Sequence, residues 1–136
     1  MRLIRLLCLL ILIGCTSVTH QSESRALELT LYAYANAIRW GDIQEALPFL
    51  DPDMRKNHPL SELDLQRYKQ VRFISYTEQP PVPAGPHQIR QVVRISLLNV
   101  NTQIEREIVD NQLWRYDEAA KHWYIVSGLP DITQRN

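Results

Sequence analysis

The fold is decided by the stretch QIRQVVRISLLNVNTQIEREIVDNQLWRY, residues 88–116. Apolar and polar side chains alternate along both of its halves, and this period of two is typical of β-strands with one buried face. Because Val100-Asn101 interrupts the alternation, we expect a long antiparallel hairpin with strands over 88–99 and 103–116. The expected opposite residues are Val93 with Ile108, Leu97 with Ile104, Arg94 with Glu107, and Val92 with Val109.

Further strands are indicated on either side of this hairpin. Residues 71–77 are rich in β-forming side chains, and residues 122–127, which follow a turn at 117–121, supply an aromatic and β-branched last strand. Between the first strand and the hairpin lies PPVPAGP, residues 80–86, whose prolines lack the amide hydrogen that a strand ladder needs. We therefore expect a loop at 80–86 and an antiparallel meander of about four strands.

The first half of the chain has a helical period instead. A helix is predicted from Ser24 to Trp40, where Gly41 is a suitable terminator. Its apolar residues form two stripes, so we expect the helix to be covered on two sides, with Tyr34 and Ile38 packed against the inward face of the hairpin. The two stripes are Leu27, Leu31, Tyr34 and Ile38, and Leu29, Ala33, Asn36 and Trp40.

Two shorter helices are predicted from their capping residues. Asp42, with Glu45 three residues later, opens one helix that Asp51-Pro52 closes. Ser61, with Asp64 three residues later, opens another that reaches about residue 70. Three N-terminal helices followed by about four strands predict an α+β domain whose curled antiparallel sheet wraps around the first helix.

The N-terminus has the pattern of a processed export signal. Arg2 and Arg5 precede eight apolar residues, 6–13, and the small residue Gly14. A helix needs about 20 apolar residues to cross a bilayer, so this run is too short to span one. A short apolar run behind a basic start is typical of a secretory signal that is removed.

The end of this segment, Leu12-Ile13-Gly14-Cys15, resembles the lipobox of bacterial lipoproteins. The resemblance implies cleavage before Cys15, a thioether link from Cys15 to diacylglycerol, and acylation of its new amino group. Several acyl chains would hold the protein firmly on a membrane, since one chain alone binds only marginally. By the sorting rule of that family, Thr16 in place of Asp favours the periplasmic face of the outer membrane. The alternative is an ordinary secretory signal with an incidental cysteine.

The predicted organisation follows from these segments. We expect a lipoprotein signal peptide at 1–14, a lipidated tether at 15–23, one α+β domain at 24–130 and a C-terminal tail at 131–136. The tether is polar and has little apolar surface to bury, so it is not expected to order itself. The remaining chain is long enough for one compact domain and too short for two.

Composition argues against several classes of partner and cofactor. The whole chain has a formal net charge of zero at pH 7, and loss of the signal's two arginines leaves it slightly acidic, which argues against nucleic-acid partners. With Cys8 removed and Cys15 lipidated, no thiol remains for a disulfide or a metal site. No glycine-rich phosphate loop is present and the histidines lack metal-ligand spacing, so no cofactor or metal is predicted. The histidines are His20, His58, His87 and His122.

Several stretches together resemble nuclear transport factor 2-like, or SnoaL-like, domains of the cystatin-like cone type. The resemblance implies a cone with a pocket between the sheet and the first helix. Members of that superfamily include dehydratases, isomerases, ligand carriers and non-catalytic partner-binding modules, so the fold does not decide the function. The residues that carry the resemblance are Tyr34–Asp42, Ala46-Leu47, Phe49-Leu50, Leu113–Tyr116 and Trp123–Val126.

Enzymes of that superfamily use a carboxylate or histidine base with a tyrosine or second acid, which suits proton abstraction beside a carbonyl. The weak candidates here are Tyr34, Asp110, Asp51 and His58. Each has a structural interpretation: Tyr34 as core, Asp51 as a turn cap beside Pro52, and His58 as a solvated connector residue. Asp110 begins a polar run, so we expect a bulge or a solvated sheet end, with a hydrated carboxylate of ordinary pKa. The alternative is a buried carboxylate, if the strand face that Asp110 shares with Ile108 and Gln112 points into the cone.

These observations favour a membrane-anchored, periplasm-facing, non-catalytic domain that binds an envelope protein or a small apolar ligand. The alternative is a cone-pocket enzyme of the dehydratase or isomerase type. A carrier needs an apolar cavity, and an enzyme needs at least two ionisable groups converging in a pocket. A protein-binding adaptor would instead expose an apolar patch.

Overall fold

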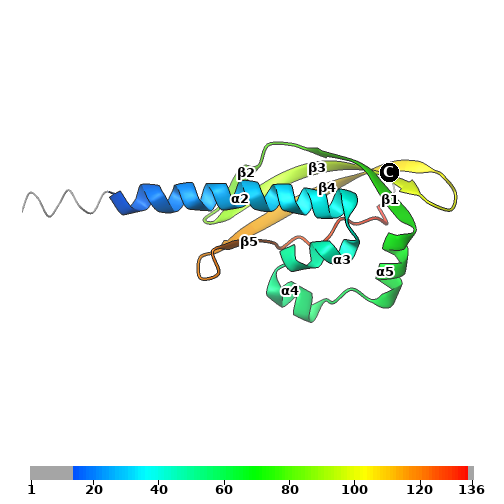
Figure 1. Ribbon diagram of the computed structural model, residues 1–136, viewed down its shortest axis with the longest axis horizontal. Helices are drawn as coiled ribbons and strands as arrows, with labels where there is room; N and C mark the ends of the chain where they lie inside the picture. The colour runs from blue at the N-terminus through cyan, green and yellow to red at the C-terminus, as the bar shows by residue number, and fades with distance from the viewer. Residues whose placement is uncertain (1–13, 135–136) are drawn as a thin grey trace, which may run out of the picture.

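The computed structural model describes residues 14–134, with side chains from Thr19 onward. The predicted signal peptide up to residue 13, the side chain of Cys15 and the last two residues lie outside the described residues. The fold is α+β: a long N-terminal helix, a group of short helices, and a curled antiparallel sheet that forms half of a barrel (Figure 1). The elements are α2 (Gly14–Trp40), α3 (Ile43–Ala46), η1 (Leu47–Phe49), α4 (Pro52–Asn57), α5 (Glu62–Lys69), β1 (Val71–Glu78), β2 (Val82–Gly85), β3 (Gln88–Asn99), β4 (Glu105–Asp117) and β5 (His122–Ile125).

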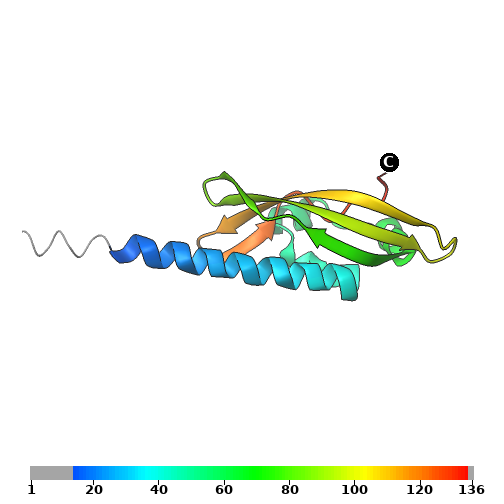
Figure 2. The same ribbon diagram turned by 90° about the horizontal axis from the view of Figure 1, so that it is seen from above.

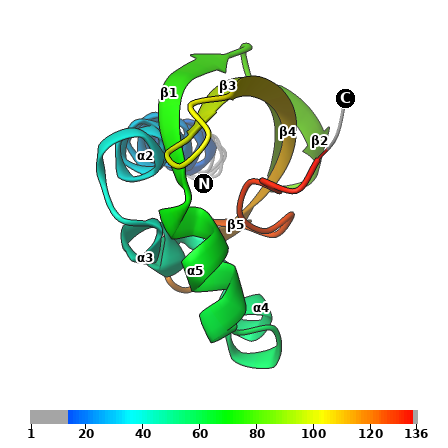
Figure 3. The same ribbon diagram turned by 90° about the vertical axis from the view of Figure 1, so that its right-hand side faces the viewer.

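The predicted antiparallel meander is present, with one additional strand. The strand order is β1-β3-β4-β5, and β2 pairs with the first residues of β3, so that β1 and β2 share one edge of that strand. The expectation of a simple loop at 80–86 is wrong over Val82–Gly85, because β2 lies at the sheet edge, where proline is tolerated. Helix α2 runs along the open side of the curled sheet and contacts β1 and β5 (Figure 3).

The long hairpin has a register that differs from the predicted one by two residues. Val93 lies opposite Asp110 rather than Ile108. The cause is a longer connection at 100–104, in which the Asn99 side chain accepts hydrogen bonds from the backbone N–H groups of residues 101 and 102 at 2.9 and 3.0 Å. A shift of two residues leaves the paired side chains of the two strands on their predicted faces, but Ile104, predicted to face inward opposite Leu97, precedes β4 and is 64% exposed. The other corrected pairs are Leu97 with Arg106, Arg94 with Val109, and Val92 with Asn111.

Helix α2 begins ten residues earlier than the predicted start at Ser24 (Figure 2). The expectation that residues 16–23 carry no regular structure is therefore wrong. Neither proline nor glycine interrupts them, and an existing helix extends at little cost. The sheet also holds this part of the helix, because the Trp123 indole N–H donates to the Glu23 carbonyl oxygen at 3.0 Å.

The predicted N-cap residues Asp42, Asp51 and Ser61 are confirmed, whereas a capping bond from Glu45 to Asp42 is not seen among the described residues. The Asp42 side chain accepts from the Gln44 N–H at 3.1 Å. Asp51 accepts from the backbone N–H of Asp53 at 3.0 Å, and so opens the additional helix α4. Ser61 and Asp64 form a full capping box at the start of α5. At the end of α2, a side chain on Gly41 would bring its Cβ within 2.8 Å of the Ala37 carbonyl oxygen.

The core lies between α2 and the concave face of the sheet. As predicted, Tyr34 and Ile38 are buried there, together with Trp114 of β4 and Ile125 of β5. A second cluster fills the part of the half-barrel nearer the hairpin turn and is formed by Val93, Ile95, Leu97, Ile108 and Ile132.

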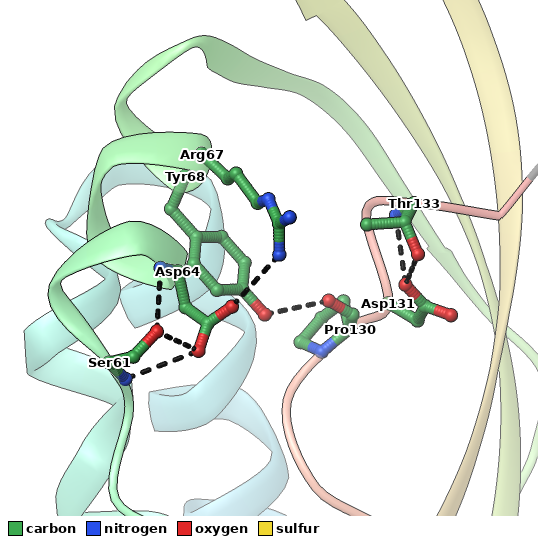
Figure 4. A network of polar contacts seen from close by, with 7 residues as sticks. All are labelled: Ser61, Asp64, Arg67, Tyr68, Pro130, Asp131 and Thr133. Carbon is green, nitrogen blue, oxygen red and sulfur yellow. Dashed lines mark hydrogen bonds and ion pairs between the residues drawn. The ribbon is translucent and has the colours of Figure 1, made fainter.

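The C-terminal segment packs beyond the predicted domain end at Pro130. Ile132 is only 6% exposed and belongs to the core. Figure 4 shows how α5 meets this segment: the Tyr68 hydroxyl donates to the Pro130 carbonyl oxygen at 2.8 Å. Asp131 stabilises the turn that follows by accepting from the backbone N–H of Thr133 at 2.8 Å. The folded unit therefore continues through the last described residue, Gln134.

Candidate functional site

A chain of hydrogen-bonded polar side chains runs along the concave face of β4. The Trp114 indole N–H donates to the side-chain oxygen Oε1 of Gln112 at 3.0 Å. The Gln112 amide in turn donates to the Asp110 carboxylate and to the Tyr76 hydroxyl, each at 2.8 Å. These four residues are called the inner polar chain below, and Gln112 and Trp114 in it are 0% exposed.

Asp110 is buried, contrary to prediction. Its strand pairs continuously with β3 through this region, without the predicted bulge, and the residue is only 7% exposed. Burial raises the pKa of Asp110 to about 6, although the hydrogen bond from Gln112 acts in the opposite direction. The expectation of a hydrated carboxylate with an ordinary pKa is wrong, because alternate residues of this strand all face the core.

Tyr34 of α2 lies against the inner polar chain. Its ring meets the Trp114 ring edge to face, with centroids 5.1 Å apart, and the Phe49 ring likewise at 5.5 Å. Its hydroxyl is buried and makes no hydrogen bond within the described residues. Burial, and then the nearby charge of Asp110, raises the pKa of Tyr34 well above its ordinary value. The predicted pair Tyr34 and Asp110 is therefore brought to one region.

Tyr34, Asp110 and Gln112 do not line any of the three hollows described within residues 14–134. A proton-transfer site requires a substrate within hydrogen-bond reach of both groups. In this conformation the inner polar chain is part of the packed interior.

The other two candidates, Asp51 and His58, lie at the two ends of α4. Asp51 is the predicted cap of α4, but its carboxylate also forms an ion pair with the Arg115 guanidinium. Burial alone would raise the pKa of Asp51, but the hydrogen bonds from Arg115 and the α4 backbone lower it. The sequence carries no signal for this pair, since the partners are far apart along the chain. His58 is exposed at the end of α4, as predicted.

Helix α2 has an uncovered apolar face that sequence reasoning misassigned. Leu29, Tyr32 and Trp40 are 62%, 71% and 75% exposed, respectively. At about 100° per residue, Leu29 and Trp40 lie within roughly 20° of each other around the helix axis, and Tyr32 about 60° to one side. We call these three residues the α2 outer face. The expectation that the second predicted stripe is covered is wrong, because the packing of α2 against the sheet and α3 leaves Leu29 and Trp40 of that stripe exposed.

A groove adjoins the C-terminal end of this face. It lies where α2 ends and β1 begins, has a volume of about 490 Å³, and is lined by Trp40, by Phe73 of β1 and by several basic side chains. The Arg39 guanidinium lies over the Trp40 ring in a cation–π contact, 4.9 Å from the ring centroid. We call this feature the α2–β1 groove, and through Trp40 it is continuous with the α2 outer face.

No three His, Cys, Asp or Glu side chains between Thr19 and Gln134, where side chains are described, lie together as metal ligands would. Within the same part of the chain, no helix is both long and apolar enough to cross a membrane. Neither the models of known protein families nor the curated proteins compared with this chain gave a match.

Proposed function

We propose that this protein is a lipid-anchored envelope protein whose domain binds a partner protein through the α2 outer face, without catalysing a reaction. The observation that carries this proposal is the exposure of Leu29, Tyr32 and Trp40 on one side of a single helix. Single exposed apolar residues are common, but large ones grouped on one face are typical of interaction sites. Tyr and Trp are also the residues most often found at binding hot spots.

The lipid anchor is proposed from the N-terminal sequence. The run Leu12-Ile13-Gly14-Cys15 supports lipidation of Cys15, and Thr16 after it supports sorting to the periplasmic face of the outer membrane. The α2 outer face would then lie on the same helix that leads from the anchor. A lipoprotein of this kind would present its partner-binding helix close to the membrane surface.

The finer fold assignment belongs to the same proposal. A half-barrel sheet with a helix along its open side supports a nuclear transport factor 2-like, or SnoaL-like, cone. In such a cone the bound molecule could be a small apolar ligand held between helix and sheet. The packing of Tyr34 against Trp114 in that space favours a protein partner over an internal ligand.

One observation favours the second candidate, a cone-pocket enzyme of the dehydratase or isomerase type. Asp110 is buried with a pKa raised to about 6, and the unpaired Tyr34 hydroxyl lies in the same interior. A base near working pH and a tyrosine donor suit proton transfer. Loss of the cellular role in Asp110→Asn, with the fold intact, would favour this candidate over a binding module.

The binding proposal is tested by removing the α2 outer face. A variant with Leu29→Ser, Tyr32→Ser and Trp40→Ser should keep its fold, because these side chains are exposed, and should lose its partner in formaldehyde-treated cells. The matched control changes three exposed apolar residues elsewhere, namely Ile74→Ser, Val82→Ser and Ile104→Ser. The proposal would be contradicted if both variants lost the cross-linked complex equally, or if neither variant lost it.

A further inference from the structure

The α2–β1 groove is lined by apolar side chains together with three basic side chains and one carboxylate. Its floor includes the buried Ile38 of α2 and the half-buried Phe73 of β1, and the exposed Trp40 forms one wall. A volume of about 490 Å³ falls within the range of sites that hold a few side chains or a small ligand. The groove is therefore large enough for one or two apolar side chains of a bound segment.

Three cations line this groove: Arg39, Lys69 and Arg72. No ion pair joins any of them to a carboxylate among the described residues. The carboxylate that also lines the groove, Asp42, is engaged as the cap of α3. The groove lining thus carries three cations against one carboxylate, an excess of positive charge beside an apolar surface. Such a surface is complementary to an anionic, partly apolar occupant.

The backbone beside the groove is suited to an extended peptide. Val71, Arg72 and Phe73, which line the groove, are the first residues of β1. In the described sheet β1 pairs only with β3 and is therefore an edge strand, which α2 contacts along the open side of the sheet. Edge strands can add a strand from another chain, with main-chain hydrogen bonds for affinity and side-chain pockets for specificity.

We infer that the α2–β1 groove binds an extended, acidic segment of the partner protein that also carries large apolar side chains. Carboxylates of that segment pair with Lys69 and Arg72, and an apolar side chain inserts between Trp40 and Phe73. The inference rests on the proposed function and adds to it the chemistry of the partner.

The test uses synthetic peptides and the full-length chain in phosphatidylcholine nanodiscs. The probe is a fluorescein-labelled nonapeptide of alternating Glu and Leu, and two comparison peptides carry Lys in place of Glu or Ser in place of Leu. Fluorescence anisotropy should show binding of the Glu/Leu peptide alone, and its affinity should fall as salt rises. Loss of either the charge or the apolar side chains should abolish the signal.

Variants of the protein locate the binding. Lys69→Glu with Arg72→Glu should lower the affinity for the Glu/Leu peptide at least about tenfold, because two attractive charge pairs become repulsive. Arg90→Glu with Arg94→Glu makes the same change of charge on exposed residues of β3, away from the groove, and should leave the affinity unchanged. The melting temperature of each variant shows whether the fold is retained.

Several outcomes would overturn the inference. If the Lys/Leu peptide bound as tightly as the Glu/Leu peptide, the groove would not select for negative charge. If the variant with Lys69→Glu and Arg72→Glu bound the Glu/Leu peptide with unchanged affinity, the peptide would bind elsewhere on the protein. Absence of peptide binding, together with binding to phosphatidylglycerol vesicles that Lys69→Glu with Arg72→Glu abolishes, would assign the groove to a lipid headgroup. If the peptide fails to bind but the α2 outer face still captures a partner in cells, the proposed function stands and this inference fails.

Discussion

The buried carboxyl group of Asp110 should make the stability of the fold depend on pH. Its pKa is raised to about 6 in the folded protein, against about 3.9 in an unfolded chain. The folded state therefore binds more protons between these values, and stability is lost as pH rises through about 6. Asp51, whose pKa is lowered, acts in the opposite sense: its contribution is lost only as the pH falls to about 4 or below.

We predict that the wild-type protein is more stable at pH 5 than at pH 7.5 by about 1 kcal/mol from Asp110 alone. In Asp110→Asn this difference should disappear, and the variant should be the more stable protein at pH 7.5. Urea unfolding followed by tryptophan fluorescence measures both values. Every other titrating group is common to the two proteins, so an Asn variant with an unchanged pH dependence would contradict the burial of Asp110.

The Tyr34 hydroxyl gives a second prediction at this scale. It is buried without a hydrogen bond among the described residues, so Tyr34→Phe should be neutral or should stabilise the fold by up to about 1 kcal/mol. Tyr76→Phe is the matched control, because the Tyr76 hydroxyl accepts a hydrogen bond from Gln112. Removing this hydroxyl should lower the free energy of unfolding by about 1 kcal/mol. A larger loss in Tyr34→Phe than in Tyr76→Phe would show that the Tyr34 hydroxyl has a partner.

Sequence reasoning at the scale of residues succeeded for caps and failed for long-range partners. Asp42, Asp51 and Ser61 were predicted as caps because a cap depends on residues two or three positions away. The burial of Asp110 depends on how the strand lies over α2, and the Arg115 partner of Asp51 comes from a distant strand. The alternation along the strand places Asp110 on the same face as Ile108, but no local pattern encodes the Arg115 partner of Asp51.

At the scale of elements, α2 has one face for the core and another for solvent. Ile38 is 1% exposed and Trp40 is 75% exposed, although they lie two residues apart. Ile38→Ala should lower the free energy of unfolding by about 2–5 kcal/mol, since it leaves a cavity in the core. Trp40→Ala, on the same helix, should change it by less than about 0.5 kcal/mol. Thermal and urea unfolding of both variants test this contrast, and similar losses in the two would mean that the helix faces are misassigned.

The elements themselves were largely predictable, with exceptions at the edges. The period of two predicted the inward faces of β3 and β4 correctly, because an error of two residues in register does not change the face of a paired side chain. The pairing itself depends on the length of the turn at 100–104, which the alternation does not show. The prolines at 80–86 indicated a loop, but an edge strand needs fewer amide hydrogens than a central one, so β2 forms. Periodicity also showed two apolar stripes on α2 but could not show that the sheet covers only one.

At the scale of the whole molecule, the lipid anchor is a separate prediction from the fold. Cys15→Ser should abolish incorporation of a radiolabelled fatty acid into the protein, because Cys15 is the one cysteine left after processing at the lipobox. Cys8→Ser is the control and should keep the label, since Cys8 lies in the predicted signal. Label that persists in Cys15→Ser, or is absent from the wild type, would contradict lipidation at this residue.

The central claim is that the uncovered side of α2 meets a partner protein. The most direct measurement places a photo-crosslinking amino acid at Tyr32 in living cells, with Ile104 as the comparison position, since both are exposed apolar residues. We predict a discrete cross-linked protein adduct from position 32 and none from position 104. Adducts from position 104 alone, or no protein adduct from position 32, would contradict the claim.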